Sequence, residues 1–453
     1  MYTLPKEPDR ADKALYEQLS TGLERSKAKQ RQDYDSPENP RLGRLPNTTG
    51  LRRISDSPAG RCEALMATRP MDTKSCTLVV MRAQVEFDLG LKYLIYLDFR
   101  GPKLVQYFTI NTLGQFRASK SLLSLSGAYT ADERVIQVEG IDYAGLVRRM
   151  IAYEIYQTRA PDPSEKLENM KAHFLRLKQE DGWKLARPAM AISVRCLLLR
   201  GHISVTLRRD YETGYFTLDK ALNILTWGRS TWLNVHTDLR GAIFSDTFYA
   251  AVFRVVVQAY QQAFVVSNGR NHRFQLPGLL QRAEALIAYA RSLHGKEIPG
   301  QERPGFITTF VEYPEAQGHF TKGWCLAEYA KKGLCKDDND QMSHRRRAFE
   351  SFLTAADLYY VDDERHAECL NSALNMLFDM KAPLRETLPV MERMRLATPG
   401  IKFIWEYSDR MRGGLDETLQ HVASFEADVR EGMKGNKPGY DLDDIVMPPW
   451  LLS

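Results

Sequence analysis

The sequence AFESFLTA, residues 348–355, lies in a longer segment in which small and aromatic side chains recur at helical spacing. Ala348, Phe352 and Ala355 are four and three residues apart, so they share one face of a helix. Small residues on that face let a second helix approach closely, and the aromatic ring fills the remaining groove. The pattern predicts a hairpin of two antiparallel helices as the building unit of the fold.

The same spacing returns in residues 368–401. Asn375 and Thr387 occupy positions at which a small residue is expected, which predicts looser packing than in a regular unit. The bulky and closing positions of this 34-residue unit are occupied by Leu374, Phe378, Met391, Met394 and Pro399.

Two further units are less regular. Gly323 stands in the first helix of the preceding unit, displaced by an insertion around residues 331–340, and Gly201 pairs with Ala221 one residue out of register. Together the units resemble the tetratricopeptide repeat, in which stacked helical hairpins form a right-handed solenoid with a concave surface. This resemblance implies a mainly α-helical protein that binds a peptide or a partner protein in a groove.

A looser resemblance rests on three phrases, KALNILTWG at residues 220–228, DERH at 363–366 and LPVMERMR at 388–395. They are similar to a group of fungal tetratricopeptide-like proteins, some of which carry an amino-terminal MYND zinc finger. The resemblance covers residues 185–450. The closely spaced cysteine pairs of that finger are missing here, so a zinc-linked role is not implied.

The charge balance gives no reason to expect nucleic acid or a membrane surface as a partner. The 453 residues include 62 basic and 57 acidic side chains, a formal net charge of +5. Such an even balance lacks the concentrated basic charge of nucleic-acid-binding domains. The 43% hydrophobic content is enough for large cores and is typical of a globular protein.

The cysteines and the amino terminus predict a cytoplasmic or nuclear protein. Six cysteines are scattered without any C-x-x-C pair, far below the density of a disulfide-stabilised scaffold. The first residues, MYTLPKEPDRADK, are charged and contain no apolar core of a secretory signal. No apolar run approaches the roughly 18 residues that span a bilayer.

Composition divides the chain into four regions. Residues 1–70 are polar and are predicted to form a disordered tail, and residues 71–140 a mixed segment packed on the solenoid. Residues 141–435 are predicted to form the tetratricopeptide-like α-helical domain. The apolar tail at residues 436–453 is predicted to dock on the last repeat, because solenoids need end caps, or alternatively to present a linear motif to a partner.

Two serines in the amino-terminal region are candidate phosphorylation sites. Arg52-Arg53-Ile54-Ser55 has the shape of a site for a basophilic kinase, and Ser57 precedes a proline. Phosphate at Ser55 or Ser57 would add charge and could recruit or release a partner.

Residues 76–130 are predicted to contain a β-hairpin. The runs at 92–99 and 104–110 are rich in β-branched and aromatic residues, and they flank a turn sequence at 100–103. A buried helix for the first run is the alternative, since short apolar runs fit both structures.

Helix boundaries in the following region are predicted from capping residues. Ser164 is expected to cap a helix that closes at Gly182, and Pro188 to lie in the first turn of the next helix. Ser245 is expected to cap a long helix.

No motif of a phosphate-binding loop, a dinucleotide fold, a metalloprotease or a nucleophile elbow is present, so no catalytic, cofactor or metal residue is predicted. His366 and Cys369 share a helix face and could supply two zinc ligands, but the sequence places no others. The acidic run Asp362-Asp363-Glu364 is expected to stabilise a helix amino terminus.

The predicted function is therefore a protein-interaction scaffold without enzymatic activity. Tetratricopeptide domains that grip peptide carboxylates use Lys and Asn on successive helices, and Arg near them would add charge. The matching candidates are Lys322, Arg345, Arg346, Arg347, Asn371 and Asn375. The alternatives are an enzyme or enzyme accessory with a site between residues 76–130 and the solenoid, or a structural subunit of an assembly.

Overall fold

The protein is mainly α-helical. The computed structural model describes residues 57–68, 74–98, 112–136, 138, 142–435 and 439–451. Its helical elements are α2 (Pro58–Thr68), α3 (Thr77–Asp98), α5 (Thr112–Ala131), η1 (Glu133–Val135), α6 (Tyr143–Thr158), α7 (Leu167–Asp181), α8 (Trp183–His202), η2 (Ile203–Leu207), α9 (Tyr211–Thr231), α10 (Thr237–Arg240), η3 (Ala242–Phe244), α11 (Asp246–Ser267), α12 (Leu276–Arg291), η4 (Thr308–Glu312), α13 (Tyr313–Lys331), α14 (Asp338–Leu358), α15 (Glu364–Asp379), α16 (Leu384–Trp405), η5 (Met411–Leu415), α17 (Asp416–Met433) and η6 (Pro449–Leu451).

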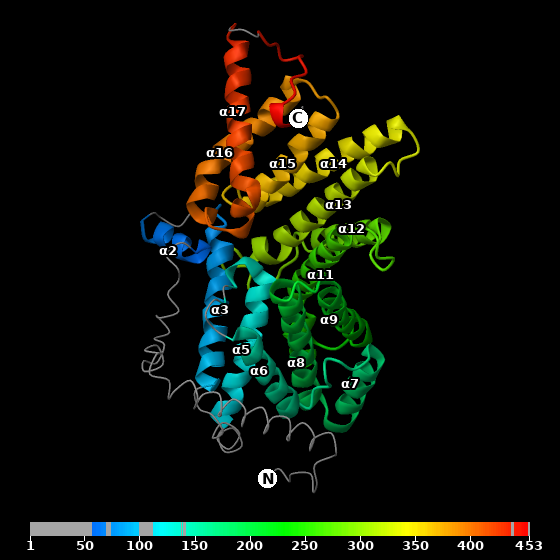
Figure 1. Cartoon of the computed structure of the whole chain (residues 1–453). Helices are drawn as coiled ribbons and strands as arrows, with labels where there is room; N and C mark the ends of the chain where they lie inside the picture. Colours follow the sequence, from blue (N-terminus) through cyan, green and yellow to red (C-terminus); the bar gives the residue numbers. More distant parts are fainter. Residues whose placement is uncertain are drawn as a thin grey trace, which may run out of the picture.

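The long helices from α8 onward pack in chain order. Each of α8, α9, α11, α12, α13, α14, α15, α16 and α17 contacts the next one, as Figure 1 shows. Short connections between apolar helices favour such antiparallel neighbours. The mainly α-helical class predicted from the sequence is thus confirmed, whereas the tetratricopeptide arrangement remains a prediction.

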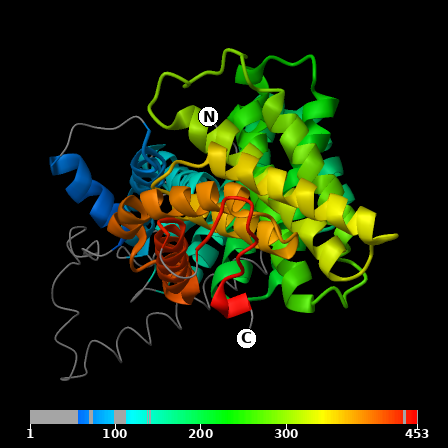
Figure 2. The same cartoon turned by 90° about the horizontal axis from the view of Figure 1, so that it is seen from above.

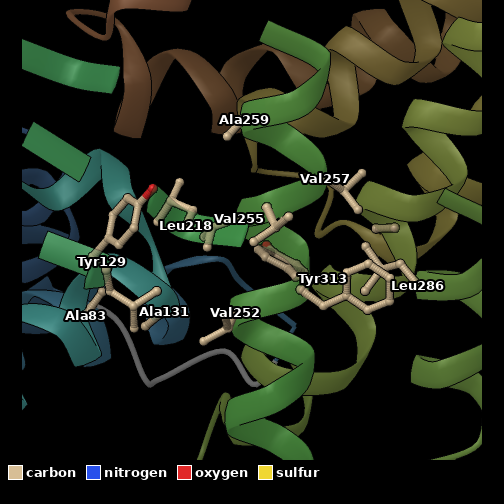
Figure 3. Close-up of a cluster of buried hydrophobic side chains, with 14 of the residues drawn as sticks. Ala83, Tyr129, Ala131, Leu218, Val252, Val255, Val257, Ala259, Leu286 and Tyr313 are labelled. Carbon is tan, nitrogen blue, oxygen red and sulfur yellow. The ribbon is translucent and has the colours of Figure 1, made fainter. Parts of the chain in front are cut away.

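Helix α11 lies at the centre of the molecule. Ser245 caps it as predicted, because the Ser245 hydroxyl accepts a hydrogen bond from the Phe248 amide at 3.3 Å. Figure 3 shows its side chains Val252 and Val255 between Tyr129 of α5 on one side and Tyr313 of α13 on the other. All of these side chains are buried, so one apolar core joins the amino-terminal helices to the later stack.

The close approach of α13 and α14 follows the small residues identified in the sequence. A Cβ atom on Gly323 would lie 3.0 Å from the ring of Phe352 and 3.1 Å from the carbonyl oxygen of Ala348. Glycine is therefore needed at this crossing. In the less regular unit, a Cβ on Gly201 would collide with Leu218 of α9 rather than with Ala221.

The predicted β-hairpin is wrong in its first half. No strand occurs among the described residues, and residues 92–98 belong to helix α3. The second run, 104–110, lies outside the described residues. Helix α3 packs along α5, and Gly90 of α3 lies so close to Leu125 that a Cβ would stand 2.6 Å from its side chain. The helical alternative was therefore correct for residues 92–98 of the first run.

The predicted tail, residues 1–70, contains a helix at its end. Helix α2 packs on α16, and Figures 1 and 2 both show it beside that helix. Arg61 donates to the Phe403 carbonyl oxygen at 2.9 Å and to Glu406 at 2.8 Å, and it lies 4.6 Å from the centre of the Tyr407 ring. Residues 58–68 therefore belong to the folded structure.

At the other end of the chain, residues 439–451 lie against α16 and α17. The backbone amides of Leu384 and Arg385, in the first turn of α16, donate to the carbonyl oxygens of Asp444 and Leu442 at 2.9 Å. These amides have no partner within their own helix. Trp450 stacks on His421 of α17, with 5.6 Å between the ring centres.

Two predicted boundaries differ from the structure. Helix α7 begins at Leu167, and Ser164 instead donates from its amide and hydroxyl to Asp162 at 2.7 and 2.6 Å. Helix α8 begins directly after Gly182, so Pro188 lies inside it rather than in its first turn.

Residues 183–207 are apolar and long enough to cross a membrane, but 72% of the apolar window is buried inside the protein. That hydropathy is typical of a core helix.

Candidate functional site

Two copies of the string Asp-Glu-Arg meet inside the molecule. The first, residues 132–134, begins η1, and the second, residues 363–365, begins α15. Each aspartate caps its own helix, because Asp132 accepts from the Arg134 amide at 3.1 Å and Asp363 accepts from the Arg365 amide at 2.9 Å. The same three residues thus make the same local turn twice.

The two strings bind each other reciprocally. Arg134 donates from both terminal nitrogens to Asp363, at 2.7 and 2.9 Å, and Arg365 donates to Glu133 at 2.7 Å. Their side chains range from 0% to 19% exposed. We call the six residues 132–134 and 363–365 the buried ion cluster.

The surrounding side chains complete the buried ion cluster. The Tyr313 hydroxyl donates to Asp363 at 2.9 Å, and Arg254 donates to Glu133 at 3.3 Å. The guanidinium of Arg134 lies 3.9 Å from the centre of the Trp405 ring. Helices α11, α13 and α16 therefore all contribute a contact to the two strings.

Two carboxylates of the cluster, those of Glu133 and Asp363, remain ionised at neutral pH. Burial alone would raise the pKa of Glu133, but the charges of Arg365 and Arg254 outweigh burial and hold this pKa well below its usual range. Burial likewise opposes ionisation of Asp363, yet Arg134 holds the pKa of that carboxyl below its usual value. Every carboxylate faces a guanidinium, so the arrangement fixes η1 against α15 rather than preparing a proton transfer.

A small cavity adjoins the buried ion cluster between α11, α13 and α15. It has a volume of about 300 Å³. We call it the glutamine cavity, because four of its lining side chains are glutamines: Gln258, Gln261, Gln262 and Gln317. Arg365 also lines it, and the Nε and Nη1 atoms of this buried side chain have no hydrogen-bond partner among the described residues.

A much larger cleft lies among α6, the α6–α7 connection, α7, α8, η2 and α9. Its volume is about 1420 Å³. Six of its lining residues are basic in type, namely Arg148, Arg159, His173, Arg200, Arg208 and Lys220, whereas Asp162 and Glu165 are acidic. We call it the basic cleft.

Lys220 of α9 binds the connection between α6 and α7 beside the basic cleft. Its ammonium donates to the carbonyl oxygens of Pro163 and Glu165 at 3.0 and 2.9 Å. Burial and the nearby charge of Arg200 lower the pKa of Lys220. In contrast, Arg148 and Arg208 are exposed, and within the described part of the chain their side chains make no hydrogen bond or ion pair.

A group of potential metal ligands lies where α14 begins. One donor atom from each of Cys335, Asp340 and His344 falls within 4.8 Å of the others. These are ligand types that zinc accepts. However, the Asp340 carboxylate accepts from the Lys336 amide at 2.9 Å and lies 3.2 Å from Nδ1 of His344. Contacts within the chain account for this group, and we assign no metal to it.

The residues predicted to bind a partner do not line any of these cavities. Lys322 pairs with Glu284 at 3.1 Å, and Arg346 pairs with Glu386 at 2.7 Å. Arg345 donates to a backbone oxygen at 3.3 Å, and Arg347 is exposed. Asn371 and Asn375 are half-buried on α15, one turn apart. Their role in binding remains a prediction.

The remaining residues singled out in the sequence are packed within the fold or lie outside the described residues. His366 bonds through Nδ1 to the Ala356 carbonyl oxygen at 2.8 Å, and Cys369 is buried. Ser57 is also buried, and its hydroxyl accepts from the Gly60 amide at 3.1 Å at the start of α2. Ser55 lies outside the described residues.

The acidic run at 362–364 was predicted to lie at a helix amino terminus, which is correct for Asp363. The second Asp-Glu-Arg string, at 132–134, was not recognised as its partner. The signal was present, since Asp-Glu-Arg occurs at 132–134 as well as at 363–365. The basic cleft gave no such signal, because its charged residues are spread over more than seventy positions and meet only in the fold.

Comparison with known proteins yields no relative: no family model, no curated protein and no solved structure matches this chain.

Proposed function

We propose that this protein is an interaction scaffold that binds an acidic, extended segment of a partner protein in the basic cleft. The observation that carries the proposal is the combination of a cleft of about 1420 Å³ with two exposed arginines, Arg148 and Arg208, that have no partner within the described residues. Exposed cations in a cleft attract and orient an anionic ligand.

The size of the cleft favours a polypeptide over a small molecule. Pockets for small molecules usually have volumes of about 300–1000 Å³, and this cleft is larger. One wall is the irregular backbone at residues 159–165, which offers peptide groups for hydrogen bonding. Ile151, Ile155 and Tyr156 add apolar surface on α6. Such a mixture suits a peptide with alternating acidic and apolar side chains.

Charge also favours an acidic segment of a partner protein, rather than the amino-terminal region of this chain, as the ligand of the basic cleft. The first 56 residues contain more Lys and Arg than Asp and Glu, so they carry no excess of the charge that the cleft would attract. An acidic segment of another protein is electrostatically complementary to the cleft. The proposal places the binding surface on α6 to α9, whereas the sequence had suggested α13 to α15.

The test uses the full-length protein and fluorescein-labelled peptides of twelve residues that combine Glu or Asp with Leu and Tyr. Fluorescence anisotropy would measure the dissociation constant for the unaltered chain and for the double variant Arg148→Glu, Arg208→Glu. We expect roughly a tenfold to hundredfold loss of affinity, because each reversal replaces an attraction by a repulsion.

The matched control is Arg303→Glu with Arg412→Glu, two exposed arginines remote in sequence from the cleft. This variant has the same net charge as the cleft variant, and its affinity should fall much less. Equal losses in both variants would show that the peptides respond to overall charge alone. Absence of binding to any acidic peptide would overturn the proposal.

A further inference from the structure

We propose that a cavity beside α8 binds a small organic acid with a single carboxylate and an apolar body, and that Arg195 holds the carboxylate. The cavity lies between α8 and residues 237–243 and has a volume of about 480 Å³. We call it the α8 cavity. It shares no lining residue with the basic cleft, so this inference does not depend on the proposed peptide binding.

The guanidinium of Arg195 is fixed in place by the fold. Arg195 is only 9% exposed, and its Nη1 atom donates to the Ser126 hydroxyl at 2.8 Å and to the Leu123 carbonyl oxygen at 3.3 Å. The centre of the Phe248 ring lies 5.4 Å from the guanidinium carbon. Contacts with α5 and α11 thus orient this side chain before a ligand binds, which lowers the entropic cost of binding.

The other edge of this guanidinium has no partner in the described part of the chain. Nη1 makes both hydrogen bonds of the Arg195 side chain, so Nε and Nη2 make none with the described residues. Both atoms remain in contact with open space, unlike Nε of Arg254, which is enclosed. Because Arg195 lines the α8 cavity and neither of the other two cavities, a ligand reaches this edge from the α8 cavity.

Arg134 shows what this edge of an arginine binds. Its Nε atom donates to Oδ1 of Asp132 at 2.9 Å, and its Nη2 atom donates to Oδ2 at 2.6 Å, so both carboxylate oxygens are held. The planar fork of arginine matches the geometry of a carboxylate in this way. Arg195 presents the same two atoms, and no ion pair joins it to a carboxylate of the described residues. A carboxylate is therefore the group that fits this edge.

The charge of Arg195 is only partly compensated within the described chain. Burial lowers the pKa of Arg195 to about 10, so the guanidinium is still positive at neutral pH. Glu86 of α3 is the carboxylate whose charge acts on it, and Glu86 acts on Arg82 as well. Burial would also lower the pKa of Arg134, but the aspartate partners of Arg134 hold that pKa well above its usual value. A ligand carboxylate would supply Arg195 with the partner that Arg134 has.

The lining of the α8 cavity is basic. Lys184, Arg187 and Arg195 line it, whereas Asp238 is its one acidic residue. The Asp238 side chain is 89% exposed, and its carboxylate lies 3.4 Å from Nδ1 of His236. The cavity therefore attracts an anion. One side-on edge binds one carboxylate, so a single acidic group is sufficient.

The rest of the lining favours an acid with an apolar body. Pro188 and Ala191 of α8 and Ile243 of η3 line the cavity. Ala191 precedes Arg195 by four residues, so it lies one turn away on the same face of α8. A carboxylate on Arg195 would thus place the body of the acid against Ala191. The volume is within the range of about 300–1000 Å³ that is usual for small-molecule sites.

The experiment is isothermal titration calorimetry of the full-length protein with three acids and their amides. The acids are butanoate, hexanoate and benzoate, and each amide has the carbon skeleton of its acid without the charge. We expect at least one acid to bind more tightly than its amide by roughly tenfold or more, because the amide loses the charge-assisted hydrogen bonds to Arg195. Acetate keeps the carboxylate but almost no apolar body, so it should bind more weakly than the best acid by roughly tenfold or more.

Two variants test the location. Arg195→Lys keeps the positive charge but removes the side-on edge, so the affinity for the acid should fall by roughly tenfold or more. Ala191→Glu places a carboxylate one turn before Arg195, where it competes with the ligand, and it should cause a similar loss. Ala172→Glu is the matched control, because this exposed position of α7 also precedes an arginine, Arg176, by four residues and lines none of the three cavities. The control should retain the affinity.

Three results would overturn the proposal. The first is that no acid binds more tightly than its amide, and the second is that inorganic phosphate binds more tightly than every acid. The third is that Ala191→Glu leaves the affinity within about twofold of that of Ala172→Glu. Circular dichroism would establish that each variant is folded. If Arg195→Lys does not fold, Ala191→Glu still decides the location, because Ala191 is only half-buried.

Discussion

The buried ion cluster and the basic cleft use the same kind of side chain under opposite conditions. In the cluster, Arg134 faces Asp132 and Asp363 at hydrogen-bond distances and is 9% exposed. In the cleft, Arg148 and Arg208 are exposed and have no partner among the described residues. Pairing, more than charge itself, therefore separates the arginines that stabilise the fold from those that are free to bind.

The largest effect is expected from breaking the cluster. Arg134→Met removes the counter-charge of two buried aspartates, and loss of one member of a buried ion pair costs about 3–5 kcal/mol. Urea unfolding would measure the change in the free energy of unfolding. Arg412→Met, which removes an exposed arginine paired with Asp409, is the control and should cost less than about 1 kcal/mol. A similar, small loss in both variants would contradict the structural role of the cluster.

The next largest effect is expected from overpacking the apolar contact between α13 and α14. Gly323→Ala places a Cβ about 3 Å from Phe352 and from the Ala348 backbone, so α13 and α14 must move apart. Overpacking of this kind costs about 1–3 kcal/mol. Gly413→Ala is a matched control, because a Cβ there has no neighbour within 4 Å. Equal melting temperatures for the two variants would show that the helices are not in close contact at Gly323.

Glu154 is a buried carboxyl whose Oε1 atom has no hydrogen-bond partner among the described residues. Glu154 on α6 is 2% exposed, and burial raises its pKa to about 8. Near pH 7 the folded state therefore keeps a proton that the unfolded state, with a pKa near 4.5, has lost. Stability contributed by this group is present below about pH 4.5 and declines as the pH rises to about 8.

Glu154→Gln removes this dependence. We expect the variant to be more stable than the unaltered chain at pH 8, with the difference shrinking towards pH 5. Melting temperatures across this pH range would measure it. A constant difference at all pH values would mean that the Glu154 carboxyl does not titrate between the two states.

The smallest effect on stability is expected in the basic cleft. The double variant Arg148→Glu, Arg208→Glu should change the free energy of unfolding by less than about 0.5 kcal/mol, because exposed side chains without partners contribute little. Thermal unfolding would measure it beside the peptide affinity described above. A loss of several kcal/mol in the free energy of unfolding would show that these arginines stabilise the fold.

The mainly helical class and several individual helices could be predicted from the sequence. Helical spacing around Phe352 and a capping serine at 245 identified real helices, because their signals are local. Residues 92–98 were assigned to a strand because β-branched and aromatic residues favour strands, but a short apolar run fits a helix as well, and the structure has a helix there.

The candidate sites could not be predicted in the same way. The buried ion cluster joins residues more than two hundred positions apart, and neither string is unusual by itself. The glutamine cavity combines residues of α11, α13 and α15 whose spacing in the sequence carries no pattern. Surface candidates such as Arg345 and Arg346 were chosen from charge alone, and both have contacts within the fold.

The separation of the two strings has a consequence for protein synthesis. Arg134 and Asp363 are 229 residues apart. A ribosome adds roughly 5–20 residues per second, so roughly 10–50 s pass between the synthesis of the two partners. During that interval Arg134 lacks the aspartate of α15, and the amino-terminal helices cannot complete their interior. A nascent chain that stops before α15 is therefore expected to be a substrate for chaperones and proteases, however well its own helices form.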